Sequence, residues 1–183
     1  MRIGIDIDDT MTNTSELINK YAKDYFKDVN LEKIKEKLYF LEYDEEIRIF
    51  LEKNLPIMMK EYQLKDNVKE VLTRLKEKGH EIFIITARAH SIKKELKEIT
   101  RDYFHKHQIK VDKIIFGTLE KGETCFNNKI DLMIDDNIKM LEQVKEKGIN
   151  TLLFTSPNNK NIKTSHKRIK TWLELEKYIN NME

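Results

Sequence analysis

The sequence has few of the features that would place it among disulfide-rich, secreted or membrane-spanning proteins. Cys125 is the single cysteine among 183 residues, which excludes an intramolecular disulfide and fits a reducing compartment. The chain contains neither a run of 18 apolar residues nor a signal-peptide pattern, so no membrane span and no secretory leader are expected. It also shows no internal repeat and no low-complexity segment. We therefore expect a soluble cytoplasmic protein.

An excess of charge of one sign is also missing. Lys and Arg number 34 against 32 Asp and Glu, which leaves a formal charge of +2, and the 36% of charged residues are mixed in sign. Such a chain has no basic stripe for a polyanion, so neither a nucleic acid polymer nor a membrane is expected as a partner. The length suffices for one α/β core with a small appendage. The expected partner is a small molecule.

The most informative segment is an apolar strand near the N-terminus that ends in three carboxylates within four residues. It reads Arg2-Ile3-Gly4-Ile5-Asp6-Ile7-Asp8-Asp9-Thr10. Strand alternation places Asp6 and Asp8 on the same face, where their charges repel unless a cation or a shared proton compensates. Mg²⁺ is the usual compensation when phosphate oxygens complete the shell. An acidic, solvated turn is the alternative interpretation of this segment alone.

Three later segments favour the metal site. A second apolar run ends at Thr86 and Arg88, Lys121 follows a third, and a fourth ends in the pair Asp135-Asp136. Parallel strands bring their carboxyl ends to one edge of a sheet, and ligands bind there. Two acidic pairs, a hydroxyl and one or two cations should then meet, a combination that suits a phosphoryl group bridged to a metal ion.

The order of elements predicts an α/β fold with a doubly wound parallel sheet. Strands are expected at 2–8, 81–86, 113–116, 130–135 and 149–154, and helices from Ser91, near 137–147 and near 168–181. Residues 11–65 have helical periodicity, with Leu55-Pro56 expected to close one of their helices. This stretch is too long for a simple connection. We therefore expect a core of residues 1–10 and 66–183 with a helical cap, 11–65, inserted after the first strand.

The four segments, in this order, resemble the four motifs of the haloacid dehalogenase (HAD) superfamily of phosphohydrolases. The D-x-D-x-T signature is Asp6-Ile7-Asp8-Asp9-Thr10, the second-motif threonine is Thr86, the lysine is Lys121, and the acidic pair is Asp135-Asp136. The resemblance covers essentially the whole chain. The small helical insert is similar to that of the 5′(3′)-deoxyribonucleotidase group. The resemblance implies a HAD-like Rossmannoid core that hydrolyses phosphomonoesters.

The resemblance also implies a role for each motif residue. Asp6 would attack phosphorus and form an aspartyl phosphate, and Asp8 would serve as general acid and then general base. Mg²⁺ would be bound by Asp6, the carbonyl of Asp8, and Asp135. Asp6 would be held ionised by the metal while Asp8 keeps a proton. The phosphoryl group and the substrate around it would be held by Thr86, Lys121 and Thr10.

The assignments of the site lysine and of Arg88 each leave an alternative open. Lys129 competes with Lys121 for the site lysine because it lies nearer the strand that ends at Asp135, whereas Lys121 leaves room for a helical turn that starts at the site. Arg88 could clasp a phosphate bidentately, or it could form a surface salt bridge to the following helix.

Three aromatic residues of the cap, Tyr39, Phe40 and Tyr43, could contact the substrate. Aromatic side chains that face a phosphate site can stack on a nucleobase. The alternative is that they form the core of a small helical subdomain, and the sequence leaves both interpretations open.

The function predicted is a Mg²⁺-dependent phosphatase for a small phosphomonoester, with 5′-nucleotidase action on (deoxy)ribonucleoside monophosphates favoured. The alternatives are a phosphatase for a sugar phosphate and a non-catalytic, receiver-like phosphoacceptor domain. A phosphomutase, which shares the four motifs, is a further alternative. A dehalogenase of the same superfamily needs no metal, and the second aspartate, Asp8, argues against it. The oligomeric state is left open, a homodimer included.

Overall fold

The computed structural model describes residues 1–27, 30–90 and 95–182. Its centre is a sheet of six parallel strands in the order β3-β2-β1-β4-β5-β6. The strands are β1 (Arg2–Ile5), β2 (Glu81–Ile85), β3 (Lys113–Ile115), β4 (Leu132–Asp135), β5 (Asn150–Phe154) and β6 (Lys167–Ile169). The chain runs outward from β1 to one edge and then, from β4, to the other. The predicted doubly wound parallel sheet is confirmed.

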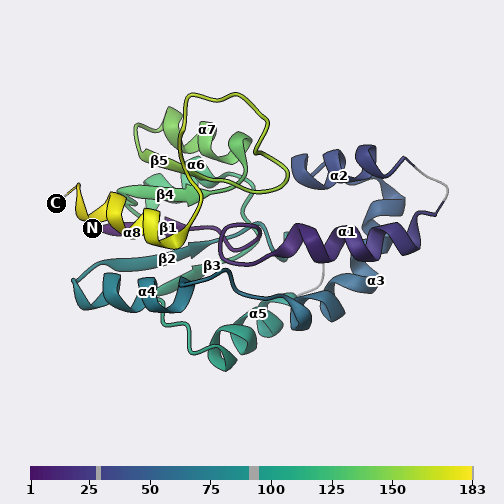
Figure 1. Ribbon diagram of the computed structural model, residues 1–183, viewed down its shortest axis with the longest axis horizontal. Coiled ribbons are helices and arrows are strands. Elements are labelled where there is room, and N and C mark those ends of the chain that lie inside the picture. The colour runs from purple at the N-terminus through teal and green to yellow at the C-terminus, as the bar shows by residue number, and fades with distance from the viewer. Residues whose placement is uncertain (28–29, 91–94, 183) are drawn as a thin grey trace.

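The two faces of the sheet are covered by different helices. One face carries α4 (Val68–Glu77) and α8 (Trp172–Asn180), and the other carries α6 (Lys121–Asn127) and α7 (Ile138–Glu146) (Figure 1). The buried apolar side chains form a first cluster under α4 and α8 and a second cluster under α6 and α7. Side chains alternate between the two faces along β2, so Ile84 packs in the first cluster and Ile85 in the second. Cys125 is fully buried in the second cluster, where it serves as a small apolar side chain.

Three helices lie together beyond one end of the sheet, between β1 and α4 in the chain (Figure 1). They are α1 (Thr14–Tyr25), α2 (Leu31–Phe40) and α3 (Glu45–Glu61). The segment leaves and re-enters the core at one place, because Thr12 and Leu64 form an antiparallel bridge and Lys65 N donates to the carbonyl of Met11 at 2.8 Å. We keep the name cap for residues 11–65, and the division into cap and core stays a prediction.

The fifth helix on the core, α5 (Glu95–Lys106), packs against α3 of the cap. A helix was expected from Ser91, but residues 91–94 lie outside those that the structure describes. Tyr103 of α5 donates its hydroxyl to the carbonyl of Tyr62, 2.9 Å away, where the chain leaves α3. The cap is thus fixed to the core both at its two chain ends and through α5.

Two details of the expected elements are wrong. Helix α3 does not end at Leu55-Pro56 but continues to Glu61, because Met58 and Met59 beyond the proline are buried and a proline removes only its own N–H from the helix ladder. The expected C-terminal helix near 168–181 begins only at Trp172, since Lys167–Ile169 forms β6. A three-residue edge strand with two basic side chains has too little alternation to be recognised.

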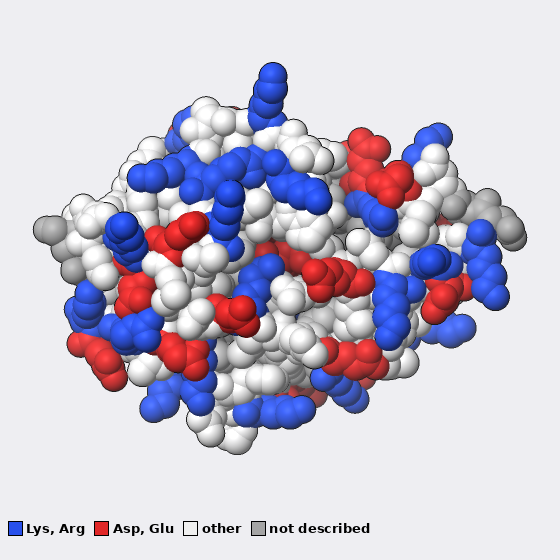
Figure 2. All heavy atoms as spheres, in the orientation of Figure 1, with Lys and Arg blue, Asp and Glu red and all other residues white. Residues whose placement is uncertain are grey.

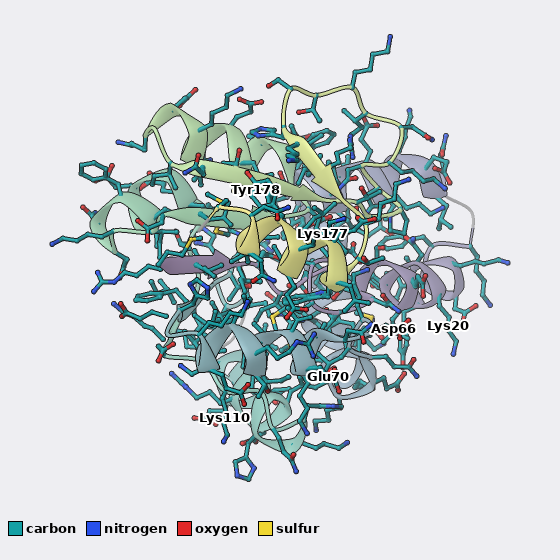
Figure 3. The ribbon with its side chains drawn as sticks, turned by 60° about the vertical axis from the view of Figure 1, so that its left-hand side comes forward. Lys20, Asp66, Glu70, Lys110, Lys177 and Tyr178 are labelled. Carbon is teal, nitrogen blue, oxygen red and sulfur yellow. The ribbon has the colours of Figure 1, made fainter. Side chains whose placement is uncertain are left out.

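The edge strand β6 is joined to α8 by a cation–π contact. The ammonium of Lys167 lies 4.4 Å from the ring centre of Tyr178. Figure 3 labels Tyr178 and Lys177 on this helix. The contact holds the last strand and the last helix together at the side of the sheet that α8 covers.

The surface carries charges of both signs, and Figure 2 shows basic and acidic side chains interspersed over one face. This mixture agrees with the near balance of charge in the sequence. Among the described residues, no helix combines the length and the apolar character needed to cross a membrane.

Candidate active site

The carboxyl ends of β1 and β4 and the start of α6 meet at one place. Asp6 follows β1 directly, and its N–H donates to the carbonyl of Ile134 at 2.9 Å, which extends the pairing of the two strands. Asp135 is the last residue of β4. Helix α6 approaches closely because its second residue is Gly122, where a Cβ would collide with the carbonyl of Gln143 on α7. The first residue of α6 is thereby brought to the two aspartates.

That first residue is Lys121, and its ammonium group is the centre of the buried site. Nζ donates to Oδ1 of Asp6 at 2.6 Å and to Oδ2 of Asp135 at 2.7 Å. The side chain of Lys121 is only 2% exposed. Burial lowers its pKa, but the two carboxylates outweigh that effect and leave the pKa raised, so the lysine is charged. Lys129 lies exposed at the far end of α6, so the structure brings Lys121, and not Lys129, to the carboxylates.

A third carboxylate joins the cluster. One oxygen each of Asp6, Asp135 and Asp136 lie within 4.8 Å of one another, and all three residues are buried. Burial and the neighbouring carboxylates raise the pKa of Asp6 to about 8 in spite of Lys121, and burial with the charges of Asp9 and Asp135 raises that of Asp136. Three buried carboxylates against one lysine lack positive charge. The donor set therefore fits a hard divalent cation with oxygen ligands.

Asp8 points into a different environment from Asp6. Its carboxylate accepts a bidentate pair of hydrogen bonds from Arg88, with Nη2 to Oδ1 at 2.6 Å and Nε to Oδ2 at 2.9 Å, and another from Thr14 Oγ1 at 2.7 Å. Burial raises the pKa of Asp8, but the Arg88 guanidinium outweighs it and holds the pKa below its ordinary value.

The expected division of protonation, in which a bound metal holds Asp6 ionised while Asp8 keeps a proton, stays a prediction. In the protein without an ion, the pKa of Asp6 is raised and that of Asp8 is lowered. The reason is the position of Arg88, which neutralises Asp8 directly, whereas Asp6 shares its lysine with Asp135. A phosphoryl dianion beside Asp8 would reverse the balance, since a neighbouring like charge favours the protonated carboxyl.

The two motif threonines lie behind the site. Thr86 is fully buried, and its hydroxyl accepts a hydrogen bond from the N–H of Arg88 at 3.2 Å. Thr10 is also fully buried, and its carbonyl accepts from Trp172 Nε1 at 3.1 Å. Neither threonine is among the described residues that line the cavity in front of the aspartates. Their contacts with substrate stay predictions.

A cavity of about 390 Å³ opens between the cap and the carboxyl edge of the sheet. Its floor contains Asp6, Asp8, Lys121 and the Asp135-Asp136 pair. Its cap side is largely apolar and includes Ile18, Leu38, Leu41, Leu51 and Leu55. A small organic molecule with one strongly anionic end matches this division, because the anionic end can reach the lysine while the remainder lies under the cap.

The three cap aromatics occupy different positions. Tyr39 is buried and tied to the acidic loop, since its hydroxyl donates to the carbonyl of Asp136 at 3.1 Å and its carbonyl accepts from Asn137 Nδ2 at 2.7 Å. Phe40 packs edge-on against Tyr39 and is not among the described lining residues. Tyr43 is half-buried and, like Tyr39, lines the cavity. Of the three, Tyr43 has both the exposure and the place to contact a substrate.

Several residues of the site gave no signal in the sequence. Thr14 and Tyr62 lie in the cap segment, and Thr100 lies within α5, yet all three surround the Asp8–Arg88 pair. Thr14 and Thr100 sit in ordinary helical patterns and Tyr62 directly follows α3, positions where a threonine or tyrosine is not distinctive. Asp136 was visible as half of an acidic pair, but strand alternation alone does not assign it to the same cluster as Asp135.

Comparison with known proteins identifies relatives over the full length. Residues 1–182 match the family model of the 5′ nucleotidase, deoxy (pyrimidine), cytosolic type C protein. The chain is 32% identical to the "Putative nucleotidase YqfW" of Bacillus subtilis, over 99% of this chain and 94% of that protein. It is 31% identical to a nucleotidase of Clostridium acetobutylicum, over 96% and 91% of the two chains.

Solved structures share the fold at lower identity. A haloacid dehalogenase-like hydrolase from Streptococcus pneumoniae superimposes with a TM-score of 0.69 at 16% identity, over 97% of each chain. A HAD-superfamily hydrolase from Ehrlichia chaffeensis gives a TM-score of 0.63 at 18% identity, over 99% of this chain and 96% of that one. These likenesses bear on the fold alone.

Proposed function

Because the chain belongs to the family of the 5′ nucleotidase, deoxy (pyrimidine), cytosolic type C protein, and is therefore a phosphomonoester hydrolase, we propose that it hydrolyses nucleoside monophosphates with Mg²⁺. The observation that carries the proposal is the cluster of Asp6, Asp135 and Asp136 on the floor of the cavity, with Lys121 bonded to the first two. The free Cys125 and the cytosolic type of the family support a cytoplasmic location.

The metal would be bound by residues that already lie together. Asp6, Asp135 and Asp136 would hold Mg²⁺ through carboxylate oxygens, with the backbone carbonyl of Asp8 added as the resemblance implies, and the bound ion would offset charge on the phosphoryl oxygens. Lys121 would hold a phosphoryl oxygen from the other side. An ester that enters the cavity would thus meet two sources of positive charge at its anionic end.

The chemistry would proceed in two steps. A carboxylate oxygen of Asp6 bonds to phosphorus as the bond to the leaving oxygen breaks, and the carboxyl of Asp8 delivers a proton to that oxygen. A water molecule then attacks the aspartyl phosphate, Asp8 takes a proton from the water, and Asp6 is regenerated with release of inorganic phosphate. Splitting the reaction this way replaces one slow hydrolysis by two easier displacements.

Mg²⁺ is expected to stabilise the folded protein. At about 100 times its dissociation constant, an ion that binds only the native state adds about 2.7 kcal/mol, which corresponds to a rise of about 5–10 °C in Tm for a chain of this size. Differential scanning calorimetry with Mg²⁺ and with EDTA measures the rise. Asp135→Asn should reduce it, while Asp66→Asn, at an exposed position, should not. An unchanged Tm together with phosphatase activity that survives EDTA would refute the metal assignment.

The preference for nucleotides is tested at Tyr43. Stacking on a base contributes about 1–3 kcal/mol, so Tyr43→Ala should reduce kcat/KM for nucleoside monophosphates about five- to a hundredfold. The loss should be much smaller for glycerol phosphate, which has no base. The measurement is phosphate release from a panel of nucleoside monophosphates and sugar phosphates by wild type and variant.

Phe40→Ala serves as the matched control because Phe40 is a neighbouring cap aromatic that does not line the cavity. It should lower stability without altering the ratio of the two kinds of substrate. A wild-type preference for sugar phosphates, or equal losses on both substrates in Tyr43→Ala, would contradict nucleotide recognition by the cap and favour the sugar-phosphate alternative.

A further inference from the structure

The guanidinium of Arg88 is directed at a carboxylate of the site and not at the cluster around Lys121. Arg88 is 7% exposed and lines the cavity. Its Nε and Nη2 donate in parallel to the two oxygens of Asp8, at 2.9 and 2.6 Å. This bidentate arrangement is the most directional pairing available between an arginine and a carboxylate. One of the two edges of the guanidinium that could clasp a phosphate, the Nε–Nη2 edge, is therefore already occupied.

The remaining surfaces of Arg88 are held by residues from three other parts of the chain. The ring centre of Tyr62, at the exit from the cap, lies 5.2 Å from Cζ. Nη1 donates to Thr100 Oγ1 on α5 at 3.5 Å, and the backbone N–H donates to Thr86 Oγ1. A side chain held in this way has little freedom to swing from Asp8 to another anion, because each of these contacts would be lost.

Asp8 is fixed from a second direction as well. Thr14 Oγ1 donates to Oδ1 of Asp8 at 2.7 Å and lies 2.7 Å from Thr12 Oγ1, which donates to the carbonyl of Ile7. The side chain of Asp8 is nevertheless 37% exposed, and Asp8 lines the cavity. Its carboxylate is thus oriented by fixed neighbours and still accessible to a ligand.

We propose that Arg88 is a positioning residue, which holds the carboxyl of Asp8 where it meets the leaving oxygen, and that it does not bind the phosphoryl group. The proposal rests on the function proposed above, in which Asp8 transfers protons. The phosphoryl group has its own cation in Lys121, whose Nζ contacts Asp6 and Asp135. The two cations of the site thus have separate tasks.

The two roles predict different dependence on the leaving group. When the ester bond breaks, the leaving oxygen takes the electron pair, and an alkoxide needs a proton from Asp8 far more than a stable phenolate does. A misplaced acid therefore slows alkyl esters selectively. Loss of a phosphate-binding arginine would instead weaken binding of every ester and of inorganic phosphate alike, because all share the same anionic end.

The experiment compares Arg88→Gln and Arg88→Lys with wild type on 4-nitrophenyl phosphate and on a nucleoside monophosphate. The ratio kcat/KM is used because it reports only steps through formation of the phosphoenzyme. General acid catalysis contributes about 10²–10⁴-fold. We expect Arg88→Gln to lose about a hundredfold on the nucleotide and less than about tenfold on the aryl ester. Arg88→Lys keeps the positive charge but lacks the two parallel N–H donors, so its losses should lie between those of wild type and those of Arg88→Gln.

Inhibition by inorganic phosphate and thermal stability separate the alternatives. The inhibition constant for phosphate should stay within about twofold of wild type in both variants, because the cation that meets phosphate is Lys121. Arg101→Gln is the matched control, since Arg101 is an exposed arginine on α5 that stacks on Phe116. A raised inhibition constant, or equal losses on both esters with or without a lower Tm, would overturn the positioning role.

Asp8→Asn distinguishes failure of this inference from failure of the proposed function. If Asp8→Asn shows no selective loss on the nucleotide, the acid role of Asp8 is wrong. If it does and Arg88→Gln does not, only the role of Arg88 is wrong. When both assignments hold, the double variant should be no more selective than Asp8→Asn alone, because the two residues then act through one proton transfer.

Discussion

Replacing Asp6 by asparagine is expected to reduce kcat by about three orders of magnitude or more while the protein stays folded. The amide has nearly the shape of the carboxylate but cannot attack phosphorus, and removal of a covalent nucleophile is among the costliest single changes in an enzyme. Asp6 also contacts Lys121 at 2.6 Å, and Asn can still accept that hydrogen bond. The measurement is steady-state phosphate release with saturating Mg²⁺.

The stability of the Asp6→Asn variant separates loss of chemistry from loss of fold. The substitution removes one of three crowded, buried carboxylates, and this burial and crowding raise the pKa of Asp6 to about 8. Tm without Mg²⁺ should therefore not fall. Asp66→Asn, at a surface position labelled in Figure 3, should leave both activity and Tm unchanged. Activity of Asp6→Asn within about tenfold of wild type would contradict covalent catalysis.

Replacing Lys121 by methionine is expected to have the largest effect on stability. Methionine keeps most of the volume but leaves Asp6 and Asp135 buried without their cation. Breaking a buried ion pair by removing one partner costs about 3–5 kcal/mol, or about 6–20 °C in Tm at this chain length. Phosphate release should also become undetectable or nearly so, because the phosphoryl oxygens lose the same charge. Chemical denaturation and the phosphate assay measure the two effects.

The double variant Asp6→Asn with Lys121→Met tests the electrostatic cause of this loss. Removing one carboxylate with the lysine should recover part of the lost stability, which is a favourable coupling in a double-mutant cycle. Lys110→Met, at the exposed end of the segment after α5 and labelled in Figure 3, is the matched control and should have little effect. If Lys121→Met unfolds at the wild-type Tm, the account of a charge-deficient buried cluster is wrong.

The sequence was sufficient to predict the convergence of the four segments because parallel strands impose it. Asp6 and Asp135 each follow the apolar run of a central strand, and β1 and β4 are neighbours in the sheet. The choice of Lys121 over Lys129 followed from spacing, since a lysine at the start of a helix can reach the edge from which that helix begins. These inferences depend only on the alternation of strands and helices along the chain and on where each strand or helix begins and ends.

The environment of Asp8 could not be predicted in the same way. Its partner Arg88 lies 80 positions away in the chain, and the pairing depends on side-chain directions at the ends of two strands. The sequence left a phosphate contact and a salt bridge to the next helix as alternatives for Arg88, and the structure shows a third arrangement, an ion pair within the site. The lowered pKa of Asp8 follows from the same pairing.

The cap was less predictable than the core because the apolar spacing of its helices does not show which side chains face the cavity. Tyr39, Phe40 and Tyr43 are close in sequence, but a left-handed residue at Leu41, with φ of 59°, turns the chain between them. Both tyrosines line the cavity, but Tyr39 is buried and hydrogen-bonded to the acidic loop, whereas Tyr43 is half-buried. No local pattern distinguishes these two positions.

Detection of phosphate on Asp6 tests the central claim most directly. Enzyme that is mixed with a nucleoside monophosphate and Mg²⁺ and quenched in acid within the first turnover should give a peptide containing Asp6 that carries one phosphoryl group, and the Asp6→Asn variant should give none. Asp8→Asn should accumulate more of the phosphopeptide if its second step, activation of water, is slowed. Phosphate found on another residue, or rapid turnover with no phosphopeptide at any quench time, would contradict nucleophilic catalysis by Asp6.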